Sequence, residues 1–382
     1  MKRTIQFIQN EPIVAFIFLM SFLFLLRSLI LPLRGDEITY YKLAENILNG
    51  RYYQSNNPSS IAPVIPFLTA LFKLNSWPIT GVILQKLFNI FLVAMGLLYV
   101  KKTLNQLDIS PKISLLILCL SIINPISIAF LSSLYPEPVI FFLFWGFMYY
   151  ILSKPNVSNL IFSLGFLISL CLTRYVFLVL GLVMLWSYRD YIKQDFSKYK
   201  WILLKYSFFA ILPLILWFKY VYWVENQNLS EISYFERFKD ENPWIYNIKA
   251  GLGLLQHYET SRVNGVPAFV SLFVPITGIR NFPMSILLIV LFIIGYLSNL
   301  NSTKVSKLFV AIILVFLGYA LAGTGFSRYW MPLLPGILIG YYFLIKRIIV
   351  KEKWMIYAGY ALAFIYIANE LRLTFKIISS NI

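Results

Sequence analysis

The sequence predicts an all-α integral membrane protein with about eleven transmembrane helices. Of its 382 residues, 59% are hydrophobic and only 13% are charged, whereas soluble domains are about half apolar and a quarter charged. Apolar stretches of roughly 15–25 residues recur along the whole chain. The net charge of +17 comes from short Lys and Arg clusters between these stretches, which is the positive-inside pattern and not a nucleic-acid-binding face. Residues 1–382 are therefore expected to form a single transmembrane domain.

Hydropathy and length define the spans. They cover approximately residues 13–33, 78–100, 113–131, 138–153, 159–173, 175–187, 201–223, 284–300, 307–322, 329–345 and 354–371. When these spans alternate across the bilayer, the basic clusters fall on one side, which the positive-inside rule assigns to the cytoplasm. The clusters are Lys2-Arg3, Lys101-Lys102 with Lys112, Lys154, residues 189–200, Lys304 with Lys307, and residues 346–353.

The same alternation leaves the longer, less basic segments on the outer side. The first outer loop covers 34–77 and the long outer loop covers 224–283, with shorter turns at 132–138 and 323–328 and a junction at Arg174. These segments carry the acidic residues that are not ordinary membrane anchors. We therefore expect a multi-pass protein of a prokaryotic inner or plasma membrane whose functional site faces outward.

The first outer loop is expected to contain two short interfacial helices. Asp36 precedes a set of apolar residues at helical spacing, and Gly50 stands where a left-handed residue would end the helix. Residues 61–74 are apolar but interrupted by prolines, which favours an interfacial or re-entrant helix over a crossing. From these residues alone, two roles fit equally well. Asp36 could cap the helix N-terminus while Glu37 complements the helix dipole, or one of the two carboxylates could act as a base where the chain leaves the lipid.

A resemblance favours the catalytic role. Residues 35–53 have the pattern Gly-Asp-Glu-x-x-Tyr-Tyr-x-Leu-Ala-x-x-Ile-Leu-x-Gly-x-Tyr-Tyr, and the Pro-rich segment 62–66 follows. This run resembles the first outer loop of GT-C superfamily glycosyltransferases, and within it the aminoarabinose transferases and protein O-mannosyltransferases, which use lipid-phosphate sugar donors. The resemblance implies that Asp36 is catalytic with Glu37 as its neighbour. Tyr40 and Tyr41 become candidate contacts within the loop.

Three further charged residues are candidates for the same site. Glu137 is held between two prolines in an outer turn, and the resemblance implies a second acidic residue in this loop. Arg174 interrupts an apolar stretch, where a charge is costly without an anionic partner such as a lipid phosphate. Arg328 follows Gly323 and Gly325, and its guanidinium matches phosphate oxygens bidentately. The alternatives are a solvated turn residue for Glu137 and snorkelling anchors for both arginines.

A metal site is only weakly indicated. His257, the one histidine, lies in the long outer loop and could bind a metal or a donor phosphate, although a surface role explains it as well. Asp36, Glu37 and Glu137 are the candidate ligands if a divalent cation such as Mg²⁺ or Mn²⁺ takes part. No cofactor follows with certainty from these residues.

Together these features lead to an expected function. The resemblance implies transfer of a hexosyl or pentosyl unit from a polyprenyl-phosphate donor to a lipid, glycan or protein acceptor, with inversion at the anomeric carbon. A transporter or flippase of a lipid-linked glycan is an alternative, because charges near spans also mark transport pathways. An outer-face glycan polymerase or ligase shares the many spans and the large outer loop. A non-catalytic membrane scaffold also stays open.

Overall fold

The computed structural model describes residues 2–50, 52, 61–74, 78–226, 242–255, 265–275, 279–322, 327–348 and 351–381. Within these ranges every regular element is a helix. The helices are α1 Lys2–Asn10, α2 Pro12–Arg27, α3 Asp36–Leu48, α4 Val64–Lys73, α5 Pro78–Gln106, α6 Pro111–Ile123, α7 Pro125–Phe130, α8 Glu137–Leu152, α9 Val157–Thr173, α10 Leu180–Asn226, α11 Pro243–Gly251, α12 Phe282–Leu297, α13 Thr303–Leu321, α14 Ser327–Trp330, α15 Leu334–Ile348 and α16 Glu352–Asn381. Short 3₁₀ turns lie at Ser28–Ile30, Tyr175–Val179, Val266–Leu272 and Met331–Leu333.

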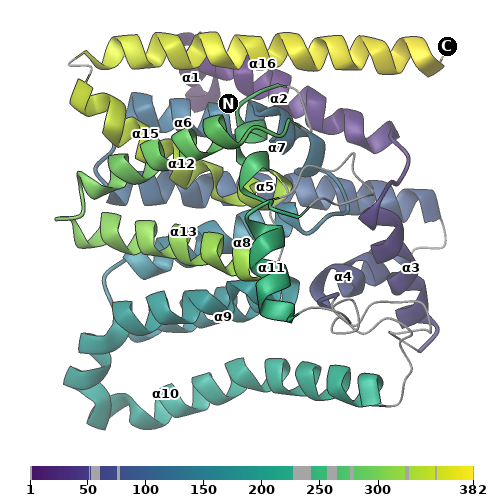
Figure 1. Ribbon diagram of the computed structural model, residues 1–382, viewed down its shortest axis with the longest axis vertical. Helices are drawn as coiled ribbons and strands as arrows, with labels where there is room; N and C mark the ends of the chain where they lie inside the picture. The colour runs from purple at the N-terminus through teal and green to yellow at the C-terminus, as the bar shows by residue number, and fades with distance from the viewer. Residues whose placement is uncertain are drawn as a thin grey trace.

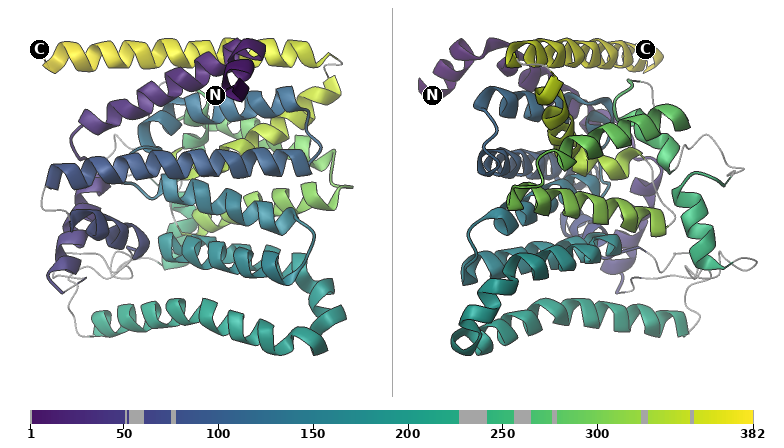
Figure 2. Two further views of the ribbon diagram at one scale, coloured as in Figure 1. Left: turned by 180° about the vertical axis from the view of Figure 1, so that it is seen from behind. Right: turned by 60° about the vertical axis from the view of Figure 1, so that its left-hand side comes forward.

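The long helices run side by side across the view, with α16 along one edge and α10 along the opposite edge (Figure 1). Both chain ends lie on the α16 side (Figure 2). The short helices α3 and α4 lie together at one end of the long helices, and α10 turns a corner at the other end. The first outer loop and the basic segment before residue 200 are thus at opposite ends of the bundle, as the expected topology requires.

The predicted all-α membrane fold is confirmed. Six helical stretches of the described chain are long and apolar enough to cross a bilayer: Pro12–Ile30, Ile79–Gln106, Tyr175–Lys193, Leu204–Val224, Thr303–Leu321 and Ser327–Ile348. Five apolar helices are shorter: Val64–Lys73, Pro111–Ile123, Glu137–Leu152, Val157–Thr173 and Phe282–Leu297. Two of these short helices, α6 and α8, are mostly buried inside the bundle, where neighbouring helices replace lipid.

One predicted span is interrupted, and another pair of spans is joined by helix. The span expected at 113–131 is divided into α6 and α7, because the Asn124 side chain accepts a hydrogen bond from the Ile126 amide at 2.9 Å and Pro125 starts the new helix. The spans expected at 175–187 and 201–223 are both present, as Tyr175–Lys193 and Leu204–Val224, and helix α10 continues through the charged segment that joins them. The segment between them contains neither Gly nor Pro, so its charged residues continue the helix.

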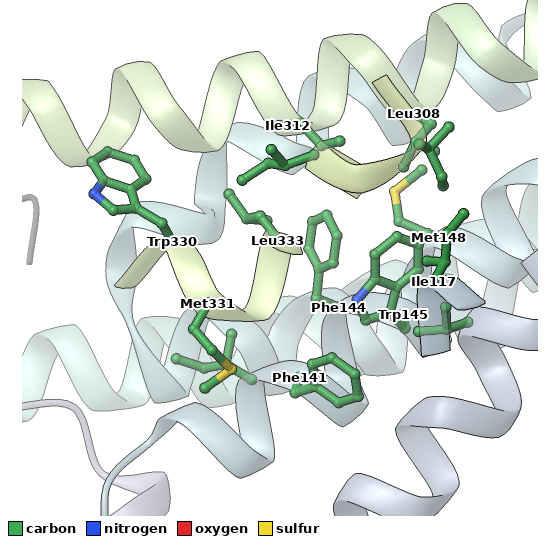
Figure 3. Close-up of a cluster of buried hydrophobic side chains, with 14 of the residues drawn as sticks. Ile117, Phe141, Phe144, Trp145, Met148, Leu308, Ile312, Trp330, Met331 and Leu333 are labelled. Atoms are coloured by element: carbon green, nitrogen blue, oxygen red, sulfur yellow. The ribbon is translucent and has the colours of Figure 1, made fainter. Parts of the chain in front are cut away.

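The core lies where α8 meets the segment that begins α15. Trp145 is fully buried and donates its indole N–H to the Pro332 carbonyl oxygen at 2.9 Å. Trp330 stacks on Phe316 with ring centroids 4.2 Å apart, and Met331 lies among the same side chains (Figure 3). Because Trp330 and Pro332 lie two and four residues after Arg328, this packing fixes the backbone that carries Arg328.

The two helices predicted in the first outer loop are present as α3 and α4, and they pack against each other. The capping differs from the expectation. Gly35, with φ of 58°, occupies the N-cap position, and Asp36 is the first helical residue and caps no backbone amide with its side chain. Gly50 has φ of 77° beyond the end of α3, as its position predicted. The Asp36 carboxylate is therefore available for a partner outside its own helix.

Candidate active site

Four charged side chains from four distant segments form one cluster, which we call the charged cluster: Asp36, Glu137, Arg174 and Arg328. A terminal nitrogen of Arg328 lies 2.5 Å from Asp36 Oδ2, and one of Arg174 lies 2.7 Å from Glu137 Oε1. Arg328 Nε is 3.8 Å from the same oxygen of Glu137. Asp36 begins α3, Glu137 begins α8, Arg174 follows the end of α9, and Arg328 lies in the short helix α14. The four residues that the sequence nominated separately are thus brought together.

Burial differs sharply within the charged cluster. The Glu137 side chain is 0% exposed, and those of Arg328 and Arg174 are 12% and 15% exposed. Asp36 is 40% exposed and is the member that reaches solvent. A fully buried carboxylate is stable only with charged partners, which Glu137 finds in the two arginines. Glu137 therefore fixes the positions of the two arginines, whereas Asp36 is accessible to a ligand that enters the site from solvent.

Aromatic rings set the orientation of both guanidinium groups. The Arg174 Cζ atom lies 3.8 Å from the centroid of the Tyr329 ring. The Arg328 Cζ atom lies 4.6 Å from the Tyr135 ring and 5.1 Å from the Tyr329 ring. Stacking of a planar guanidinium on these rings leaves its N–H edge pointing toward anions. Tyr135 was not nominated from sequence, although its place two residues before Glu137 is a signal that could have found it.

Glu37 lies beside the charged cluster but has different partners. Its Oε2 atom accepts a hydrogen bond from the Arg34 amide at 3.1 Å, and its Oε1 atom accepts one from the Leu134 amide at 2.9 Å. The residue is only 3% exposed. Both of its carboxylate oxygens are therefore occupied by backbone donors, unlike those of Asp36.

The two tyrosines of the first outer loop face different ways. Tyr40 lies near Arg174, and burial raises the pKa of its phenol, an effect that the Arg174 charge opposes only in part. Its hydroxyl is a proton donor at neutral pH. Tyr41 instead carries the Lys73 ammonium over its ring at 3.7 Å, and Lys73 in turn pairs with Glu45 at 2.5 Å. Tyr41 therefore faces away from the site, and His257 lies outside the described residues.

The donor set of the charged cluster fits a divalent cation poorly. Its two carboxylates are already matched by two guanidinium groups, and Glu37 is committed to backbone amides. A hard cation prefers several free carboxylate or carbonyl oxygens. Among the described residues, no three His, Cys, Asp or Glu side chains gather as ligands. The arrangement suits an anion next to the arginines better than a metal.

An apolar groove of about 690 Å³ lies between the helices of the first outer loop and α10. We call it the lateral groove; it is lined by residues of α3, α4, the end of α9 and the second half of α10, and these are Ile47, Gly50, Tyr52, Pro63, Val64, Phe67, Leu172, Pro213, Leu216, Trp217 and Tyr220. Leu172 is two residues before Arg174. The indole N–H of Trp217 donates to the Tyr175 hydroxyl at 2.7 Å. The groove therefore lies near the segment that carries Arg174.

No protein-family model and no curated protein matches the sequence. The structure is similar to a crystal structure of ArnT from Cupriavidus metallidurans bound to undecaprenyl phosphate, with a TM-score of 0.51 and 13% identity over 87% of this chain. A crystal structure of the same protein in the apo state gives a TM-score of 0.49 with 14% identity over 86% of this chain. The chain spans about 60% of the length of the ArnT chain it matches. Its fold is therefore similar to that of ArnT, as the resemblance in the first outer loop implied.

Proposed function

We propose that this protein is a glycosyltransferase that moves a sugar from a polyprenyl-phosphate-linked donor to an acceptor at the outer membrane face. The observation that carries this proposal is the charged cluster, in which a solvent-reaching carboxylate, Asp36, lies directly beside two ring-stacked arginines. A base and an anion-binding pair at one point are what transfer from a phosphate-linked sugar needs. The shared fold with ArnT, whose crystal structure contains undecaprenyl phosphate, supports the class of donor.

The donor phosphate binds to Arg328 and Arg174 in this proposal. Guanidinium groups form paired hydrogen bonds with phosphate oxygens, and both arginines are largely buried, which strengthens the interaction. Arg328 contacts Asp36 in the structure. An incoming phosphate therefore competes for this contact and frees the carboxylate for the acceptor.

The lateral groove holds the polyprenyl chain of the donor. Its lining is almost entirely aliphatic and aromatic, and it includes Leu172, two residues before Arg174. An isoprenoid chain whose phosphate lies on the arginines would bury its apolar surface there, with about 25 cal/mol gained for each Å² removed from water. The groove thus explains how a membrane-dissolved donor is held at the end of the bundle.

The reaction is a single displacement. The acceptor hydroxyl or amine attacks the anomeric carbon, and the bond from that carbon to the phosphate oxygen breaks. Asp36 takes the acceptor proton, and the lipid phosphate leaves with the bonding electron pair on its own oxygen, where the two arginines stabilise the negative charge. One attack from the opposite side inverts the anomeric configuration. The transferred unit is a hexose or pentose, and the acceptor is a lipid, a glycan or a protein.

The site faces the outer side of a prokaryotic inner or plasma membrane. This orientation is supported by the basic clusters, which the positive-inside rule assigns to the cytoplasm, and by the position of α3 and α4 at the end away from the α10 corner. A flippase would also bind a lipid-linked glycan. Its charges would be expected near the bilayer centre on interrupted helices, whereas the charged cluster lies at helix ends.

The test uses inverted and right-side-out membrane vesicles that contain the full chain. Vesicles receive polyprenyl-phosphate sugars with a radiolabel in the sugar, and the label is followed into water-insoluble acceptors and across the bilayer. Transfer that is lost in Asp36→Asn and kept in Glu45→Gln, a surface carboxylate on the same helix, supports the proposal. Movement of labelled donor across the bilayer without transfer would instead identify a flippase.

A further inference from the structure

We propose that Glu37 is a positioning residue that fixes Asp36 and Glu137 relative to Arg328 by joining the first outer loop to the turn before α8. This inference rests on the proposed function, and it assigns to Glu37 no contact with substrate. Its basis is that the two carboxylate oxygens accept backbone N–H groups from two different segments, Arg34 and Leu134. We call this arrangement, together with the Tyr135 contact described below, the loop tie.

The first half of the loop tie is local. Glu37 reaches back three residues to the Arg34 amide at 3.1 Å, in the manner of a residue that completes a helix N-terminus. The second half spans 97 positions of the chain, from Glu37 to the Leu134 amide at 2.9 Å. Asp36 directly precedes Glu37, and Glu137 begins α8 three residues after Leu134. The two carboxylates that contact Arg328 are thus carried by segments that Glu37 holds together.

Tyr135 forms a second connection between the same segments. Its hydroxyl donates to the Arg34 carbonyl oxygen at 3.0 Å, and its ring lies 4.6 Å from the Arg328 Cζ atom. Burial raises the pKa of Tyr135, an effect that Arg328 opposes in part, so the phenol keeps the proton that this hydrogen bond needs. Gly35 allows the close approach, because a Cβ atom there would lie 2.7 Å from the Tyr135 hydroxyl.

The segment before Asp36 is held from a third side. Lys86 on α5 is 2% exposed and donates to the carbonyl oxygens of Ser28 at 2.6 Å and Leu31 at 2.9 Å. The chain that leaves the first span is therefore anchored on the bundle before the loop tie begins. With its start anchored, the loop tie is what determines where Asp36 points.

Glu37→Gln tests this role, and it also removes the negative charge that interacts with the buried Lys86 ammonium. Glutamine keeps one oxygen acceptor, but its amide NH₂ cannot accept from the second backbone N–H, so one half of the loop tie is lost without a change in volume. Displacement of a reacting group by about 1 Å can lower a rate roughly 10²-fold. We expect Glu37→Gln to lower kcat for transfer by about this factor, with a KM for the donor close to that of the unmodified protein.

Two readouts separate positioning from chemistry. The acid limb of the pH–rate profile is expected to stay where it is in the unmodified protein, because the base is still Asp36. Tyr135→Phe breaks the companion contact, so the double variant with Glu37→Gln is expected to lose less activity than the product of the two single losses. An acid limb that disappears in Glu37→Gln would make Glu37 the base and would overturn the inference.

A third readout does not depend on activity. Amide hydrogen exchange in peptides that cover 131–136 is expected to be faster in Glu37→Gln than in the matched control Glu45→Gln, because the Leu134 amide loses its acceptor. Faster exchange with unchanged kcat would leave the loop tie as a structural contact only and would overturn the positioning role. If the unmodified protein transfers no sugar, the proposed function fails, while the exchange result still decides whether Glu37 joins the two segments.

Discussion

Asp36 and Glu37 are adjacent in the chain, yet their carboxylates have entirely different partners. Asp36 meets the guanidinium of Arg328, 292 positions away, whereas Glu37 binds only backbone amides. One carboxylate is left for exchange with an incoming ligand and the other holds the local backbone. The two adjacent acidic residues of the first outer loop therefore have different roles: Asp36 can bind a ligand, and Glu37 holds the backbone.

Asp36→Asn is expected to abolish measurable sugar transfer, because the amide cannot take the acceptor proton. General base catalysis contributes about 10²- to 10⁴-fold. The transfer rate should therefore fall by at least this factor, which brings it to or below the detection limit. The measurement is transfer of label from a polyprenyl-phosphate sugar in membranes with matched protein content. Glu45→Gln on the same helix serves as the control and should stay within twofold, roughly, of the unmodified protein. Equal rates in Asp36→Asn and the control would exclude Asp36 as the base.

Arg174→Met is expected to lower stability as well as activity. It leaves the fully buried Glu137 with one distant guanidinium, and removal of one member of a buried ion pair costs about 3–5 kcal/mol. The unfolding temperature in detergent should fall well below that of Arg372→Ala, which removes an exposed arginine on α16. Adding Glu137→Gln should restore much of the stability and none of the transfer. A single variant as stable as the control would contradict a structural role for the pair.

Filling the lateral groove should discriminate among donors by chain length. Val64→Trp places an indole in the groove, so a donor with a long prenyl chain loses apolar contacts and its KM should rise by about tenfold, equivalent to about 1.4 kcal/mol. A donor with one or two isoprene units should be unaffected, because it does not occupy the groove. Leu71→Trp on the exposed face of α4 is the matched control. Similar KM values for long-chain donors in both variants would remove the groove from donor binding.

Gly35→Ala is expected to disturb the site through the backbone. Gly35 has φ of 58° and ψ of −131°, and its Cβ would meet the Tyr135 hydroxyl at 2.7 Å. Strained backbone of this kind costs about 1–3 kcal/mol, and relief would shift Asp36, so transfer and unfolding temperature should both fall. Gly165→Ala in α9, where a Cβ meets nothing within 4 Å, should leave both unchanged or slightly raise stability. Equal behaviour of the two variants would disprove the close contact.

The sequence predicted the members of the charged cluster but not their pairing. Charges that interrupt apolar stretches are costly, so Arg174 and Glu137 stood out individually. Alternation of the spans placed them on one side with Asp36 and Arg328. Which arginine meets which carboxylate depends on helix packing over 292 positions, and hydropathy contains no information about it. The role of Glu37 was equally hidden, because its partners are backbone amides that every residue possesses.

The lateral groove was beyond sequence reasoning for a different reason. It depends on α10 being one continuous helix that brings Trp217 and Tyr220 back against α3 and α4. The charged segment 189–200 correctly separated two spans, since charges usually lie outside lipid. Hydropathy did not show that the helix continues between them, which helix propensity in a segment without Gly or Pro explains.

The balance of two carboxylates against two guanidinium groups has a consequence for turnover. A sugar-linked phosphodiester brings a single negative charge into the cluster. After transfer, the released monoester carries roughly −1.5 to −2 near neutral pH, while Asp36 has been neutralised by the acceptor proton. The total charge enclosed at this end of the bundle is therefore almost the same before and after the reaction. The charge that Asp36 loses on protonation is replaced by the charge that the lipid phosphate gains. When Asp36 later releases its proton, its carboxylate again pairs with Arg328 and repels the lipid phosphate. This repulsion favours departure of the product lipid.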